Sequence, residues 1–155
     1  MSAAAISKDE LRDLYRELIL DHARRPRHFG RLDDATHEAE GINPLCGDKL
    51  HLYLRLDGDA IRDAAFEGTG CAISVASASL LTDTVIGMSP AEAASYFDGV
   101  TARLTGSEAA AEFDPGKLRA LEGVREFPSR VKCATLAWHA LRSAMEQRPE
   151  PATTE

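Results

Sequence analysis

The chain has 155 residues and a mass of 16.8 kDa, which is the size of one domain. With 18 Lys and Arg against 25 Asp and Glu, the net charge is −7 and the pI is about 5.2, so nucleic acid is a poor candidate partner. No apolar run approaches the roughly 18 residues that a membrane span needs, and the first residues lack a secretory signal pattern. We therefore predict one cytoplasmic domain over residues 1–155 that binds neither nucleic acid nor a membrane.

The first predicted element is an amphipathic helix. Ser7 and Glu10 have the spacing of a capping box, which marks a helix N-terminus. Apolar residues then recur at the spacing of one helical face: Leu11, Leu14, Tyr15, Leu18 and Ile19. The pattern ends before Pro26, and residues 1–7 ahead of the helix are expected to be flexible.

A small antiparallel sheet follows the helix. Residues 49–56 alternate strictly between leucine and polar or aromatic residues, which is the pattern of a half-buried strand. Asp57 and Gly58 supply a tight turn, after which residues 60–67 return as a partner strand whose imperfect alternation indicates a bulge. Residues 36–42 add a third strand, so we predict a sheet of about three strands.

Helices dominate the second half of the chain. Residues 72–86 are dense in Ala and Ser and predict a helix with a small-residue face that stops at Gly87. Residues 87–123 read as a helical insert, in which Ser89 and Glu92 form a capping box and Asp114 precedes a first-turn proline.

The last predicted helix covers residues 128–147 and is terminated by Pro149. The tail at residues 148–155 is expected to be flexible. Helices packed on a small antiparallel sheet make the predicted fold class α+β.

Three cysteines and one aspartate are the residues with the most suggestive chemistry. Cys46 and Asp48 are separated only by Gly47, which lets both side chains point at one centre. Cys71 stands at the start of a predicted helix, where partial positive charge favours a thiolate, and Cys133 lies in the opening turns of the last helix. Three thiolates and a carboxylate would complete a tetrahedral zinc site.

Two other interpretations of these residues stay open at this point. Free cysteine is often a small core residue, and the spacing contains no paired C-x-x-C motif. A Cys–His hydrolase is also conceivable, because five histidines are available to activate a thiol: His22, His28, His37, His51 and His139.

Three segments together resemble the IscU/NifU-type iron–sulfur cluster assembly family. They are the run Asn-Pro-Leu-Cys-Gly-Asp at residues 43–48, the Gly-Thr-Gly-Cys run within residues 67–79, and residues 127–138 around Cys133. The resemblance covers residues 11–145. It points to the SufU branch, because Lys132 stands where IscU proteins carry a histidine, no Leu-Pro-Pro-Val-Lys segment precedes it, and an insert lengthens the interval before Cys133.

The resemblance implies an IscU/SufE-like α+β fold and a metal site formed by Cys46, Asp48, Cys71 and Cys133. In the SufU branch this site is understood to hold zinc. The protein would act as a sulfurtransferase-type acceptor of persulfide sulfur from a SufS-type cysteine desulfurase, a pyridoxal phosphate enzyme. Cys46 would be the residue that accepts the sulfur.

A scaffold function remains open beside sulfur transfer. The same four ligands fit iron or a [2Fe–2S] cluster, which would be handed to downstream Suf assembly proteins or apoproteins. A structural zinc domain serving as an interaction module is a third option. Arg130, close ahead of Cys133, is expected either to steer a partner's carboxylate or neutralise the anionic site, or to be a solvated arginine at a helix start.

Overall fold

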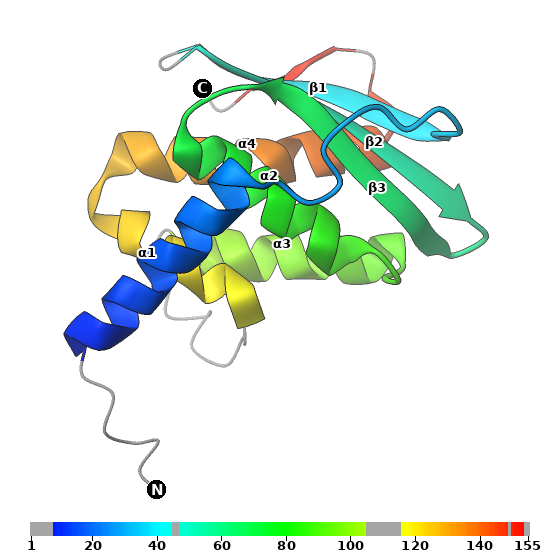
Figure 1. The fold of residues 1–155 in the computed structure, drawn as a ribbon. Coiled ribbons are helices and arrows are strands. Elements are labelled where there is room, and N and C mark those ends of the chain that lie inside the picture. The colour runs from blue at the N-terminus through cyan, green and yellow to red at the C-terminus, as the bar shows by residue number, and fades with distance from the viewer. Residues whose placement is uncertain (1–7, 45–46, 105–115, 149, 154–155) are drawn as a thin grey trace, which may run out of the picture.

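A twisted sheet lies on one side of the molecule and the helices lie on the other, as the computed structural model in Figure 1 shows. The structure describes residues 8–44, 47–104, 116–148 and 150–153. This arrangement confirms the predicted α+β fold. In the part of the chain that is described, no helix is long and apolar enough to cross a membrane.

The first three strands form an antiparallel meander. They are β1 (His37–Asn43), β2 (Asp48–Asp57) and β3 (Ala60–Thr69). The register between β2 and β3 shifts at Arg55 and Leu56, which places the predicted bulge beside the turn. All three strands lie within two residues of the predicted boundaries.

A fourth, two-residue strand was not predicted. β4 (Ala152–Thr153) pairs in parallel with Gly41 and Ile42 of β1, so the strand order is β3-β2-β1-β4. Two residues are too few to produce a recognisable period, and β4 adds to the edge of β1 that the meander leaves unpaired. The expected flexibility of residues 148–155 stays a prediction.

In the described part of the chain, five helical segments lie on one side of the sheet: α1 (Lys8–Arg24), α2 (Ala72–Val85), α3 (Pro90–Leu104), the 3-10 helix η3 (Gly116–Glu126) and α4 (Pro128–Met145). The capping box of α3 is formed as predicted, with each of Ser89 and Glu92 accepting the other's backbone N–H at 3.1 Å. The starts predicted at Ser7 and Asp114 lie outside the described residues. That residues 87–123 are an insert stays a prediction.

One apolar residue of the predicted first helix, Leu14, is exposed and does not face the core. The side chain is 55% exposed, whereas Ile19 on the same helix is buried and Tyr15 and Leu18 pack against the core. The apolar stripe of α1 is wider than the strip that its neighbours cover, so the residue at its edge faces water.

Helices α2 and α4 form the layer next to the sheet and position the candidate site (Figure 1). Helix α4 approaches β1 closely because Gly41 has no side chain. A Cβ atom there would lie 3.2 Å from Leu136 Cδ1 and 3.3 Å from Ala140 Cβ. This close packing holds α4 against the strand that leads into the β1–β2 connection.

Candidate metal centre

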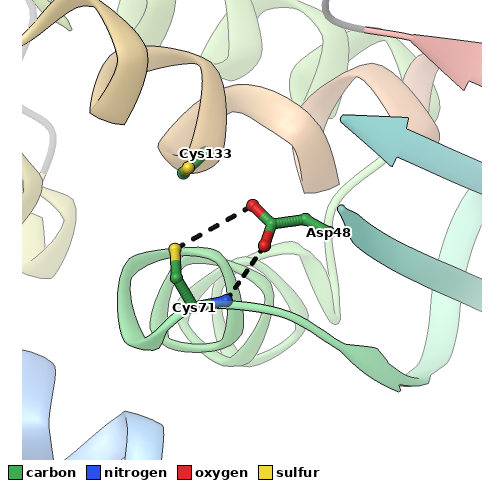
Figure 2. A group of neighbouring side chains, drawn as sticks. All are labelled: Asp48, Cys71 and Cys133. Carbon is green, nitrogen blue, oxygen red and sulfur yellow. Dashed lines mark hydrogen bonds between the residues drawn. The ribbon is translucent and has the colours of Figure 1, made fainter. Parts of the chain in front are cut away.

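Three potential metal ligands from distant parts of the sequence converge at one end of the sheet. Figure 2 shows Asp48 at the start of β2, Cys71 just ahead of α2 and Cys133 in α4. One ligand atom from each residue lies within 4.8 Å of the other two. The structure therefore brings together three of the four residues predicted from the sequence.

Asp48 is 1% exposed, and its carboxylate is oriented by the backbone of Cys71. Its Oδ1 accepts a hydrogen bond from Cys71 N at 3.0 Å, while Oδ2 lies 3.9 Å from Cys71 Sγ. Among the described residues, no Lys or Arg forms an ion pair with Asp48. Burying a carboxylate costs free energy unless a cation or several hydrogen-bond donors compensate its charge. Oδ2 of Asp48 is therefore suited to bind a cation.

Cys71 is the N-cap residue of α2 and is exposed. Its Sγ accepts a hydrogen bond from Ser74 N at 3.4 Å, so one free amide of the first turn points at the sulfur. The partial positive charge of the helix N-terminus suits a negatively charged ligand at this position. The predicted place of Cys71 at a helix start is confirmed.

Glycines bring the end of β3 close to β2 and thereby bring Cys71 close to Asp48. At Gly68, whose φ is +147°, a Cβ atom would lie 2.1 Å from the Lys49 carbonyl oxygen. At Gly70, a Cβ atom would lie 3.0 Å from Asp48 Oδ1. The two glycines of the Gly-Thr-Gly-Cys run are therefore required by close approach, Gly68 to the backbone of β2 and Gly70 to the Asp48 carboxylate.

Cys133 is the sixth residue of α4, and its side chain points toward Asp48 and Cys71 (Figure 2). It is 3% exposed, in contrast to Cys71. The Nδ2 of Asn43 lies 3.6 Å from Cys133 Sγ and donates a hydrogen bond to it. Asn43 lies in one of the three family motifs but was not predicted as a functional residue; its position ahead of the Cys46 loop was the available signal.

Cys46, the fourth predicted ligand, lies outside the described residues. The described residues on either side of it lie close together, because Asn43 pairs with Asp48 across the sheet and Gly47 N donates to Asn43 O at 2.9 Å. The loop that carries Cys46 thus begins and ends beside the group of three ligand atoms.

Arg130 is exposed in the first turn of α4, three residues ahead of Cys133. Its guanidinium lies 5.9 Å from the centre of the Phe127 ring, which is 52% exposed. Arg130 is not part of the ligand group, and its predicted role at the site stays a prediction.

No histidine joins the described cysteines, Cys71 and Cys133, in the ligand group. The group of metal-ligand atoms found among the described residues contains no histidine. His22, for example, is buried and its Nδ1 forms a hydrogen bond with Ser79 Oγ at 2.6 Å. For Cys71 and Cys133, this geometry gives no support to the Cys–His hydrolase considered from the sequence.

Comparison with known proteins identifies the family. Residues 14–152 match the NifU-like N-terminal domain. The chain belongs to this family. It is 43% identical to the iron–sulfur cluster assembly scaffold protein IscU of Streptococcus pyogenes, over 92% of this chain and 88% of that protein. It is also 43% identical to the zinc-dependent sulfurtransferase SufU of Bacillus subtilis, over 85% of this chain and 89% of the relative.

A solved structure agrees with this assignment. A protein from Fervidobacterium islandicum, described as a candidate scaffold for the SUF system, superposes with a TM-score of 0.76 at 35% identity. The match covers 83% of this chain and 94% of that chain. The family resemblance predicted from the three cysteine motifs is therefore confirmed for this NifU-like chain.

The donor set of the NifU-like site fits a thiophilic metal. Two sulfurs and one carboxylate oxygen suit Zn²⁺ or the iron of a cluster, whereas Mg²⁺ and Ca²⁺ prefer oxygen ligands throughout. The Asp48 carboxylate, which is buried and forms no ion pair with a Lys or Arg of the described residues, is the structural observation that supports this fit.

Proposed function

We propose that this chain acts in iron–sulfur cluster assembly as a zinc-dependent sulfur acceptor that works with a SufS-type cysteine desulfurase. The observation that carries the proposal is the convergence of the buried Asp48 carboxylate with Cys71 and Cys133 at the end of the Cys46 loop. The similarity to a protein named zinc-dependent sulfurtransferase SufU supports the same function.

Four residues would hold the zinc ion: Cys46, Asp48, Cys71 and Cys133. When bound, zinc would supply positive charge that keeps these thiols deprotonated at neutral pH. The chain's own residues orient the ligand atoms. The amide of Cys71 occupies Asp48 Oδ1, which leaves Oδ2 as the carboxylate oxygen on the side of Cys71 Sγ.

In the proposed reaction, Cys46 is the nucleophile. Its thiolate attacks the terminal sulfur of the desulfurase's cysteine persulfide, so a new S–S bond forms on Cys46 and the S–S bond of the partner breaks. The desulfurase cysteine leaves as a thiolate, and no external oxidant or reductant is consumed. Cys46 is better suited than Cys133 because Cys133 is 3% exposed and fixed within a helix.

Recognition of the desulfurase is expected to be electrostatic in part. The net charge of −7 favours a partner with a basic surface and an association that weakens as salt is added. Arg130 would add a local positive charge to this acidic surface, because its exposed guanidinium beside Phe127 can pair with a carboxylate of the partner.

Mass spectrometry after incubation with a cysteine desulfurase and cysteine tests this function. We expect the mass of one additional sulfur atom on Cys46 and a faster release of alanine by the desulfurase. Cys46→Ser should abolish both effects, and Arg130→Ala should raise the concentration of this chain needed for half-maximal stimulation. A Cys46→Ser protein that accepts sulfur at the normal rate would contradict the proposal.

A scaffold function on the same residues is the second candidate. The observation that favours it is the 43% identity to a protein named as an assembly scaffold, IscU, together with a carboxylate among the ligands. A carboxylate is a weaker ligand than a thiolate for a [2Fe–2S] cluster, which suits a cluster that must be transferred to an apoprotein. Iron and sulfide bound in equal amounts would support this candidate.

A further inference from the structure

Asn43 places a buried amide beside the candidate metal centre. It is the last residue of β1 and is 0% exposed. Its Nδ2 lies 3.6 Å from Cys133 Sγ, within range of an N–H···S hydrogen bond, and its Oδ1 is buried without a hydrogen-bond partner among the described residues. Across the sheet it pairs with Asp48.

We infer that Asn43 is a positioning residue of the metal site: its amide holds the sulfur of Cys133 in the direction of Asp48 and Cys71. This inference rests on the proposed metal-binding function. Asn43 would not be a ligand itself, because its amide nitrogen acts as a donor to the sulfur.

The burial of Asn43 supports the inference. An asparagine side chain that is fully buried with an unpaired oxygen is unfavourable, and an apolar side chain of similar size would avoid this cost. Such a replacement would remove the N–H that Asn43 donates to Cys133. Because Cys133 is also buried, water is poorly placed to take over the donation.

Asn43 makes two contacts that suit it to this positioning role. The backbone of Asn43 closes the Cys46 loop through the Gly47 N–H, and its side chain contacts Cys133 in α4. One residue therefore connects the loop that bears Cys46, one of the proposed ligands, to the helix that bears Cys133. Hydrogen bonds to ligating sulfurs also lower their electron density and so tune the metal site.

The test compares Asn43→Leu with wild-type protein and with Thr82→Val as a matched control. Leucine has a similar size but lacks the N–H donor. Thr82 is a buried polar residue near the far end of α2, where its hydroxyl donates to Ser79 O at 2.9 Å. Zinc affinity is measured by competition with a chromophoric chelator, and sulfur electron density by the thiolate-to-cobalt charge-transfer absorption of the Co(II)-substituted protein.

We expect Asn43→Leu to bind zinc about 10- to 100-fold more weakly and to shift the charge-transfer absorption to lower energy. Thr82→Val should change neither quantity, even where it lowers the melting temperature. A folded Asn43→Leu protein with wild-type affinity and absorption would overturn the role of Asn43 while leaving the proposed metal site intact. Wild-type protein that binds neither zinc nor cobalt would overturn both.

A second measurement needs no variant and decides the question if Asn43→Leu fails to fold. In wild-type protein loaded with an NMR-active cadmium isotope, one Asn43 side-chain amide proton should be shifted downfield and show scalar coupling to cadmium through the sulfur. An Asn43 amide with an ordinary chemical shift and no coupling in the metal-loaded protein would overturn the inference.

Discussion

Gly70→Ala should damage the metal site while leaving the fold in place. An added Cβ atom would lie 3.0 Å from Asp48 Oδ1 and 3.2 Å from Ser74 Cβ, whereas ordinary contacts begin at 3.4 Å. The backbone at Gly70 does not have a positive φ, so the substitution introduces crowding and no left-handed strain. The atom that must give way is an oxygen of a proposed ligand.

The size of the effect follows from these distances. To restore an ordinary contact, the Asp48 carboxylate or the backbone must move by about 0.4 Å, twice the ±0.2 Å within which metal–ligand distances are normally held. We expect zinc affinity to fall about 10- to 100-fold, which is the range for a disturbed ligand environment. Overpacking should also cost about 1–3 kcal/mol of folding free energy.

Gly41→Ala is the matched control for this experiment. A Cβ atom there meets Leu136 and Ala140 at 3.2 and 3.3 Å, so the crowding is similar but involves no ligand atom. Both variants should lose stability in urea titrations, while Gly70→Ala should lose clearly more zinc affinity than Gly41→Ala in a chelator competition, because only the added methyl group at Gly70 displaces a ligand atom directly. Equal zinc affinities for Gly70→Ala and wild-type protein would refute the account of the Asp48 carboxylate.

Three further predictions concern the fold and the accessibility of the thiols. Burial, reinforced by the charge of Arg142, holds the pKa of His139 below its ordinary value of 6.5. As the pH falls, His139 therefore takes up its proton in the unfolded chain before it does so in the folded protein, and the free energy of unfolding measured in urea should fall below about pH 6.5. His139→Phe should weaken this pH dependence. An unchanged dependence of the unfolding free energy on pH in the variant would contradict the role of His139. Trp138→Ala should lower the free energy of unfolding in the same assay by about 3–5 kcal/mol, because Trp138 is 0% exposed. A decrease of less than about 1 kcal/mol would contradict the place of Trp138 in the core. In metal-free native protein, iodoacetamide should modify Cys71 readily and Cys133 only after unfolding, and equal rates would contradict the described burial.

Local patterns were sufficient to predict most of the fold. The strict alternation of residues 49–56 and the capping box of Ser89 and Glu92 each correspond to an observed element, because both patterns act within a few residues. The strand β4 and the exposure of Leu14 were not predicted, because each depends on which distant surface is left uncovered.

The candidate site could be predicted only in part from the residues themselves. The sequence predicted Cys71 at the start of one helix and Cys133 in the opening turns of another, but the distance between them depends on tertiary packing, and the family resemblance supplied their grouping. Asn43 received no role because its contact with Cys133 joins residues 90 positions apart. Nothing in the local sequence encodes that contact.

Metal and acid-labile sulfide content tests the central claim most directly. Protein purified without oxygen and without a metal-chelating column is compared with Asp48→Ala prepared in the same way. A zinc-dependent sulfur acceptor predicts one zinc ion per chain without sulfide, and less zinc in Asp48→Ala because a ligand is lost. Iron and sulfide in equal amounts, with a cluster stabilised by Asp48→Ala, would contradict the account and assign the chain to cluster assembly on its own ligands.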